Sequence, residues 1–263
     1  MWLYNFGLSL YAFAIALVSP WHRKAKRWRD GRKHLLQRMA EAIDPSEPIV
    51  WVHVASLGEF EQGRPIIEKI RLEHPRYKIL LTFFSPSGYE IRKDYPGADY
   101  IFYLPIDTPR NARRFLDIVR PEIAIFVKYE FWINLLTGLR RQGIRTYIVS
   151  AIFRRNSVFF RQWGGLWRQA LETFDTLFVQ NEESRILLGK LGFDNVVVAG
   201  DTRFDRVAQI AANAKRIELV ERFRGGERLF VAGSTWGPDE ELLIELMNAN
   251  PGIKFVVAPH EMD

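Results

Sequence analysis

Glu59 occupies a position in the sequence that suits acid–base chemistry. It ends the segment Val-Ala-Ser-Leu-Gly-Glu at 54–59, where an apolar, β-branched run gives way to a helical pattern. Ligands of open α/β sheets bind outside the carboxyl ends of strands, and a carboxylate in a first helical turn can act there as a general base. The same spacing also fits a capping box, with Ser56 as the N-cap. Spacing alone favours the capping box, although Gly58 would let the backbone pass close to a ligand.

Hydroxyl groups follow two other apolar runs. Ser85, Ser87 and the adjacent Gly88 come directly before a helical pattern, and the segment 233–235, Gly-Ser-Thr, does the same near the end of the chain. Helix-start N–H groups and hydroxyls together suit a phosphate or sugar-hydroxyl site. For the first segment the alternative is an ordinary serine N-cap. The second segment is a natural place for the phosphate of a nucleotide.

Charged residues follow further apolar runs. Lys128 and Glu130 are costly to bury unpaired, so we expect them to face a cleft or to form a local ion pair with each other. Arg154 and Arg155 suit a phosphate or lipid headgroup, because a guanidinium offers paired donors; a solvated basic loop is the alternative. Arg203 lies in the segment that closes the last strand of the first half.

Metal and nucleotide motifs are missing from the sequence. It has no cysteine, no P-loop, no complete GxGxxG and no metal-ligand spacing. His53, His74 and His260 are far apart in the chain. We therefore predict no metal, and we interpret His53 as a residue packed on a strand.

The elements that must position these residues alternate along the chain. Apolar runs separated by helical patterns predict an α/β fold of βαβ units with a parallel sheet and helices on both faces. Strands are expected at 49–54, 78–84, 100–104, 123–127, 146–150, 176–179 and 196–199, and helices at 61–74, 87–94, 109–119, 131–142, 166–174 and 182–191. A helix over 204–223 and a further unit with strands at 229–232 and 254–257 around a helix at 238–247 complete the pattern.

The formal net charge of +6 is concentrated near the N-terminus. Residues 1–38 hold eight Lys or Arg and one acid, Asp30, so the rest of the chain is close to neutral. This distribution argues against nucleic-acid binding. The basic segment comes after an apolar stretch, Trp2 to Trp21, which predicts a membrane anchor with the basic residues against anionic headgroups on the cytoplasmic side. An amphipathic helix that lies flat in the interface is the alternative.

Together, these motifs in this order resemble the family of 3-deoxy-D-manno-octulosonic acid (Kdo) transferases, which glycosylate the lipid A precursor of Gram-negative envelopes. The matching segments are 51–59, 85–88, 103–107, 130–132, 180–183, 200–205 and 231–235. The resemblance implies a GT-B fold, in which two Rossmann-like domains face each other across a cleft. The first handles the lipid acceptor and the second holds CMP-Kdo, and transfer inverts the anomeric centre without a metal or other cofactor.

The resemblance also implies roles for the candidate residues. Glu59 becomes the general base that deprotonates the acceptor hydroxyl. The acceptor side would comprise Ser56, Gly58, Ser85, Ser87, Gly88, Glu130 and Arg154, and the donor side Arg203, Gly233, Ser234, Thr235 and His260. The implied partners are CMP-Kdo, the lipid A precursor and anionic lipids of the inner membrane, at whose cytoplasmic face the protein would work.

The expected domains divide the chain into five ranges. We expect an anchor at 1–21, a basic juxtamembrane linker at 22–47, the acceptor domain at 48–205, a linker at 206–226 and the start of the donor domain at 227–263. Relatives continue beyond Asp263, so we expect this chain to be a truncated member that binds acceptor but transfers sugar poorly or not at all.

The sequence departs from the family pattern at three places. Many relatives carry an acid at the position of Lys128, Arg203 replaces a lysine, and the segment 258–260, Ala-Pro-His, lacks a family arginine. Two alternatives therefore stay open. One is a transferase or epimerase that uses a different nucleotide sugar, and the other is an inactive fragment that binds lipid.

Overall fold

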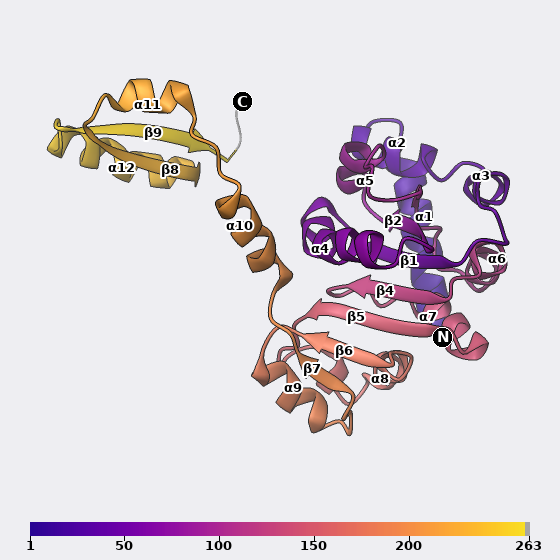
Figure 1. The fold of residues 1–263 in the computed structure, drawn as a ribbon. Helices are drawn as coiled ribbons and strands as arrows, with labels where there is room; N and C mark the ends of the chain where they lie inside the picture. The colour runs from indigo at the N-terminus through magenta and orange to yellow at the C-terminus, as the bar shows by residue number, and fades with distance from the viewer. Residues whose placement is uncertain (261–263) are drawn as a thin grey trace. The chain divides into compact units, whose positions relative to one another are not determined.

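The protein is described by a computed structural model, and the description extends over residues 1–260. The chain divides into two units after Gln209, and each is described by itself (Figure 1). The predicted domain boundaries stay predictions. The last three residues of the range 227–263 lie outside the described part of the chain.

The first unit is built on a seven-stranded sheet with the order β3-β2-β1-β4-β5-β6-β7. Its strands are β1 (Ile49–Val54), β2 (Lys78–Phe83), β3 (Tyr100–Tyr103), β4 (Ile123–Val127), β5 (Arg145–Ala151), β6 (Thr176–Val179) and β7 (Val196–Val198). All neighbouring strands are parallel. The predicted parallel sheet is thus confirmed, and every strand end lies within one residue of its expected place. The strand order reverses between β1 and β4, and such a reversal leaves a crevice at the carboxyl ends of the two strands.

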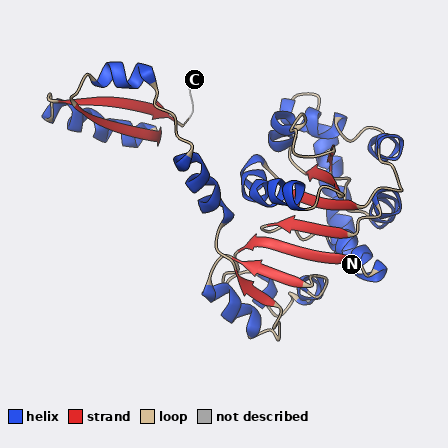
Figure 2. Ribbon diagram, viewed as in Figure 1, coloured by secondary structure: helices blue, strands red, loops and turns tan. Residues whose placement is uncertain are grey.

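Helices cover both faces of this sheet (Figure 2). They are α4 (Leu57–Glu73), α5 (Pro86–Arg92), α6 (Pro109–Val119), α7 (Ile133–Gln142), α8 (Gly165–Leu171) and α9 (Glu182–Gly189), with a short 3-10 helix at Val158–Phe160. Successive β1 side chains point to opposite faces. Trp51 accordingly packs in one hydrophobic core with α6, α7 and α8, whereas Val52 packs in a second with α4. All six β1 residues are buried, so the strand is a rigid support for the turn into α4.

Three helices precede the sheet, α1 (Trp2–Val18), α2 (Arg23–Asp30) and α3 (Leu35–Ala42). The expected spanning anchor over Trp2 to Trp21 is wrong. The helix ends at Val18, and at about 1.5 Å per residue its 17 residues fall short of a ~30 Å hydrocarbon core. In the described residues no helix combines the length and the apolar character that crossing a membrane requires.

Polar residues at the start of α1 are bound to the first unit. The Tyr4 hydroxyl donates to Asp107 at 2.7 Å, and the Asn134 amide donates to Asn5 at 2.9 Å. Asp107 also accepts the backbone N–H groups at the start of α7. Burial raises the pKa of Asp107 to about 6 in spite of these donors. The first turn of α1 is therefore part of the protein's own fold.

The second unit contains α10 (Thr202–Ala212) in part, then α11 (Glu218–Arg224), β8 (Arg228–Thr235), α12 (Gly237–Ala249) and β9 (Ile253–Pro259). Strands β8 and β9 pair in parallel, as the predicted βαβ unit requires. The single helix expected over 204–223 is wrong, because residues 213–217 interrupt it. No glycine or proline lies in that interruption, so the sequence carries no breaker signal there.

Candidate active site

Glu59 lies at the junction between β1 and α4, at the carboxyl edge of the sheet. Ser56 is the N-cap residue of α4, and its hydroxyl makes no capping bond. The Glu59 carboxylate instead accepts the backbone N–H of Ala55 at 2.5 Å. That N–H belongs to the residue before the N-cap, so the two reciprocal bonds of the capping box that spacing favoured are not both formed, and the serine hydroxyl stays available. A Cβ on Gly58 would meet no atom within 4 Å, so open space lies over this turn.

The surroundings of Glu59 make it a stronger base than an ordinary glutamate. Burial raises the pKa of Glu59 to about 7, and the negative charge of Glu130 adds to the increase. The N–H groups of Ala55 and Ser56 and the charge of Lys128 act in the opposite direction. A carboxyl with a pKa near 7 is well matched to proton abstraction near neutral pH.

Glu130 lies in the loop between β4 and α7, and its side chain is largely buried. Its Oε2 accepts the indole N–H of Trp132 at 2.8 Å and lies 3.1 Å from Nε2 of His53 on β1. The expected alternative, an ion pair between Lys128 and Glu130, is not formed among residues 1–260. Two carboxyl groups, those of Glu59 and Glu130, thus come from the two sides of the strand-order reversal, and the charge of Glu130 acts on Glu59.

His53 and Trp132 are residues of this site that the sequence analysis did not assign. The interpretation of His53 as packed was right about burial, since the ring is fully inaccessible, but it missed the contact with Glu130. The sequence did carry one signal for this contact. A lone polar residue on a strand whose other residues are all apolar must find a hydrogen-bond partner when it is buried.

The loop from Phe84 to Gly88 lies directly beside the Glu59 junction. The Ser85 N–H donates to the Ala55 carbonyl at 2.7 Å, and a Cβ on Gly88 would come within 3.1 Å of the Leu57 nitrogen. The Ser85 hydroxyl caps α5 and lies 2.9 Å from the Ser87 hydroxyl. The N-cap alternative is therefore correct for Ser85, and its position next to Glu59 leaves room for a second role of the pair.

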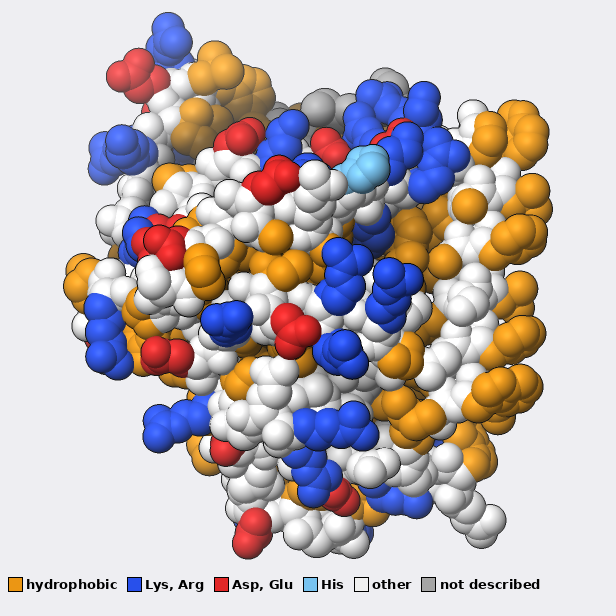
Figure 3. All heavy atoms as spheres, turned by 90° about the vertical axis from the view of Figure 1, so that its right-hand side faces the viewer, with side chains coloured by type: hydrophobic (Ala, Val, Ile, Leu, Met, Phe, Trp, Pro, Cys, Tyr) orange, Lys and Arg blue, Asp and Glu red, His pale blue; other side chains and the backbone are white. Residues whose placement is uncertain are grey.

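Two cavities run from this loop to α1 and α2. One, of about 330 Å³, is lined by Tyr11, Ile15, His22, Lys24, Ala25, Trp28, Phe84, Ser85 and Pro86. The other, of about 530 Å³, is lined by Trp21, His22, Arg23, Lys24, Arg27, Pro86, Ser87, Glu90 and Ile91. On this side of the molecule, hydrophobic side chains form a row beside a cluster of Lys and Arg (Figure 3). The combination of apolar wall and basic rim suits an amphiphile that carries negative charge.

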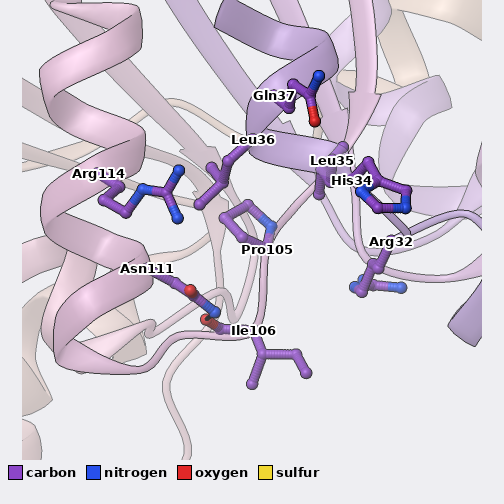
Figure 4. A pocket seen from close by; sticks show the side chains of 9 residues that line it. All are labelled: Arg32, His34, Leu35, Leu36, Gln37, Pro105, Ile106, Asn111 and Arg114. Carbon is purple, nitrogen blue, oxygen red and sulfur yellow. Dashed lines mark hydrogen bonds between the residues drawn. The ribbon is translucent and has the colours of Figure 1, made fainter.

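A third cavity, of about 350 Å³, contains none of the predicted site residues (Figure 4). It is lined by Arg32, His34, Leu35, Leu36, Gln37, Pro105, Ile106, Asn111 and Arg114. Arg32 was expected to face headgroups with the rest of the basic segment, and that expectation is wrong. Its guanidinium lies 4.0 Å from the centre of the Trp28 ring and donates to the carbonyl oxygens of Phe84 and Leu104. Arg32 thus fastens the N-terminal helices to the edge of the sheet.

The remaining predicted residues of the first unit are more exposed. Arg154 comes after β5 in an exposed loop, where its charge opposes the burial that raises the pKa of Tyr129. Arg203 does not point freely toward a ligand, because its guanidinium contacts Asp201 at 2.6 Å. Burial works against ionisation of Asp201, but hydrogen bonds from Arg203 and Gln62 prevail and lower its pKa to about 2.

The predicted donor residues gather at the carboxyl ends of β8 and β9. The Ser234 hydroxyl lies 2.9 Å from Nδ1 of His260, whose ring lies 4.4 Å from that of Trp236. Thr235 donates to Glu240 at 2.9 Å. A Cβ on Gly233 would meet no atom within 4 Å. Ser234 and His260 are exposed, so this group of hydroxyl, imidazole and ring faces solvent.

Three kinds of comparison bear on this fold and site. Kdo transferases of Aquifex aeolicus and Bordetella pertussis are 27% and 28% identical to this chain, over 85% and 92% of it. The chain spans about 60% of the length of these relatives, 58% and 60% respectively. Among solved structures, the UDP-GlcNAc 2-epimerases of Methanocaldococcus jannaschii and Neisseria meningitidis are similar, with TM-scores of 0.56 and 0.54. They are 15% and 14% identical, and each alignment covers 81% of this chain and 66% of the other. That likeness confirms a Rossmann-like fold alone.

A family model supplies the remaining comparison. The model of the 3-deoxy-D-manno-octulosonic-acid transferase family matches residues 26–206, which include Glu59, Glu130 and the Ser85 loop. The match covers most of the chain, and the relatives above carry the same description. This chain belongs to the 3-deoxy-D-manno-octulosonic-acid transferase family.

Proposed function

We propose that this protein is an inverting glycosyltransferase that moves Kdo from CMP-Kdo to a hydroxyl group of the lipid A precursor. The observation that carries the proposal is the position of Glu59. Its carboxyl group is partly buried at the carboxyl end of β1, beside open space, and burial raises its pKa to about 7. Membership of the Kdo transferase family supports the choice of Kdo as the transferred sugar.

A base at this position accounts for the reaction. Glu59 takes the proton of the acceptor hydroxyl as its oxygen attacks the anomeric carbon of Kdo. A new carbon–oxygen bond forms, the bond from that carbon to the CMP phosphate breaks, and the electron pair leaves with CMP. In our proposal no metal takes part. In this proposal Gly233, Ser234, Thr235 and His260 are donor-binding residues of the second unit, and Arg203 is a donor-binding residue of the first.

The acceptor would bind along the surface from the Ser85 loop to α1. The two cavities there join an apolar wall, which includes Tyr11 and Ile15, to the basic side chains of Lys24 and Arg27. In this proposal an acyl chain contacts the apolar wall and the phosphates contact the basic side chains. We further propose that α1 lies flat in the cytoplasmic face of the inner membrane, because Trp2, Phe6 and Phe13 are each more than half exposed.

Lipid binding tests this function directly. The chain is titrated with nanodiscs that contain the tetra-acylated lipid A precursor and with nanodiscs of a plain anionic phospholipid at equal charge. We expect selective binding of the precursor, weakened roughly thirtyfold by the double change Ser85→Ala and Ser87→Ala, since each lost hydrogen bond is worth about 1 kcal/mol. Ser46→Ala, which removes an exposed hydroxyl from another loop, serves as the control. Equal binding to both kinds of disc would contradict the proposal.

Donor binding tests the alternative sugar nucleotide. The chain is titrated with CMP-Kdo and with UDP-GlcNAc. Preference for the CMP nucleotide supports the proposal, and preference for the uridine nucleotide would favour an epimerase or a different transferase.

A further inference from the structure

Helix α1 packs on the first unit with one face. The residues of that face recur every three or four positions and are partly buried, namely Tyr4, Asn5, Leu8, Ala12 and Ile15. The rest of the helix is exposed and largely apolar. The packed face reaches the start of α7, and Tyr11 beside it reaches Phe84, which follows β2. Both of these places border the candidate active site.

The first turn of α1 supplies part of the cap of α7. Helix α7 begins at Ile133, and the side chain of the preceding residue, Trp132, does not cap it. The Ile133 N–H donates instead to the Tyr4 hydroxyl at 3.3 Å, and the next two N–H groups donate to the Asp107 carboxylate at 2.9 and 2.8 Å. The Tyr4 hydroxyl itself donates to Asp107 at 2.7 Å. The N–H groups of a first helical turn have no partner within their own helix, so these two side chains fix where α7 starts.

Asn134 adds a second contact between α1 and α7. Its side-chain amide donates to Asn5 at 2.9 Å and also to the backbone carbonyl of Asp107. Asp107 is fully buried and Asn134 nearly so. A buried polar group that loses its partner costs more free energy than the hydrogen bond itself is worth. The start of α7 is therefore held firmly only while the first turn of α1 is in place.

Trp132 connects this cap to the candidate active site. Its indole N–H is shared between Oε2 of Glu130 at 2.8 Å and Nε2 of His53 at 2.9 Å. Its ring packs against Phe84, with ring centres 4.6 Å apart, and Phe84 stacks in turn on Tyr11 of α1 at 6.2 Å. Helix α1 thus acts on Trp132 in two ways, through the backbone at the start of α7 and through aromatic rings.

We propose that Tyr4 is a positioning residue of the candidate active site, which holds the loop from Glu130 to Trp132 in place through the start of α7. The inner face of α1 is then part of the framework of the site, in addition to any contact of the outer face with lipid. The proposal rests on the proposed function in one respect, that this loop belongs to an active site. Tyr4 acts through other residues, because its hydroxyl group is engaged with Asp107 and the Ile133 N–H.

Hydrogen exchange of the tryptophan indole N–H groups tests the proposal without any turnover. The chain is labelled with nitrogen-15 tryptophan and studied by NMR in nanodiscs of anionic phospholipid, with the Trp132 signal assigned from Trp132→Phe. Tyr4→Phe removes only a hydroxyl group. We expect the Trp132 indole N–H to exchange roughly tenfold faster in this variant, because a hydrogen bond to a charged group is lost. Trp51, which is fully buried on β1, reports opening of the whole unit and should change less than about threefold.

Tyr100→Phe is the matched control. The Tyr100 hydroxyl also donates to a carboxylate, that of Glu47 at 2.6 Å, but it lies at the start of β3, at the amino edge of the sheet. Its loss should not accelerate the exchange of Trp132 relative to that of Trp51. Asn5→Ala removes the other contact of α1 with α7 and should act in the same direction as Tyr4→Phe.

The outcomes separate this proposal from the proposed function. Equal acceleration of Trp51 and Trp132 in Tyr4→Phe would mean a general loss of stability and would overturn the proposal, as would no change in either. Asn5→Ala decides the question in the same way if Tyr4→Phe does not fold. Selective acceleration of Trp132 in a protein that never transfers Kdo would support the role of Tyr4 and contradict the proposed reaction. In a full-length protein that transfers Kdo, Tyr4→Phe should lower kcat/KM for the lipid acceptor and leave the KM for CMP-Kdo unchanged.

Discussion

Glu59 and Asp239 occupy equivalent places in the two units of the molecule. Each is the third residue of a helix that comes after a parallel strand, α4 after β1 and α12 after β8. Each carboxylate also binds back to a backbone N–H at the start of its helix, that of Ala55 in one case and Trp236 in the other. The two strand–helix junctions are therefore built alike, and the sequence alone offers little to distinguish Glu59 from Asp239.

The difference lies in the sheet that surrounds each junction. Strand β1 has neighbours on both sides and is buried along its whole length, whereas β8 has only β9 beside it in the described residues and leaves Val231 62% exposed. Glu59 consequently lies next to groups supplied by β4 and its loop, and Asp239 lies in solvent. A capping carboxylate becomes a strong base only when neighbouring strands bury it and place charge beside it.

The largest expected effect is on catalysis. In the proposed reaction Glu59→Gln removes the general base, so it should lower Kdo transfer by roughly 10²–10⁴-fold. Asp239→Asn, the equivalent change in the second unit, should lower it less than about threefold. Rates are measured with CMP-Kdo and the lipid A precursor at saturating donor. Equal losses in the two variants would mean that the two junctions are not functionally different.

The next effect is on stability. Phe83 on β2 is fully buried, and Phe230 on β8 is 42% exposed. Phe83→Ala should lower the free energy of unfolding by about 3–5 kcal/mol, whereas Phe230→Ala should cost less than about 1 kcal/mol. Urea denaturation measures both, with Trp51 as a fluorescent reporter in the first unit and Trp236 in the second. A similar cost at both positions would show that the second unit has a core as well packed as the first.

The smallest effect is the pH dependence of stability. The pKa of Glu59 is raised to about 7 in the folded chain, so the folded state holds this proton more tightly than the unfolded state does. The protonated Glu59 carboxyl group therefore contributes to the free energy of unfolding at low pH, and this contribution is lost as pH rises to about 7. Glu59→Gln should therefore stabilise the first unit at pH 8 relative to pH 4, by roughly 1–3 kcal/mol.

Asp239→Asn supplies the contrast to that prediction. It removes a capping bond from an exposed helix start and should cost about 0.5–1 kcal/mol at pH 8. Both variants are measured by urea denaturation at the two pH values. Destabilisation by Glu59→Gln at pH 8 would mean that its carboxylate serves only as a cap.

Sequence periodicity predicted the sheet well because each strand of the first unit carries its own apolar, β-branched signal. Glu59 could be named as a candidate for a similar reason, since the strand–helix junction that carries it is local in the chain. The His53–Glu130 contact could not, because it depends on β1 and β4 being neighbours although they are 77 residues apart at these positions. Arg32 was misjudged for the same reason, since its partners lie on loops after β2 and β3.

Backbone strain at the strand ends has a consequence for engineering. Lys128, Ser150 and Ser234 have φ values of 70°, 53° and 60°. These values lie in the left-handed region of the backbone, which residues other than glycine and asparagine rarely adopt. Each residue held in this region lowers the stability of the folded state by about 1 kcal/mol or more. All three lie at or near the carboxyl ends of strands, where the candidate residues gather. Asparagine adopts this region more readily, so substituting it at any of the three positions should raise thermal stability, at the expense of the native side chain at a strand end where candidate residues gather.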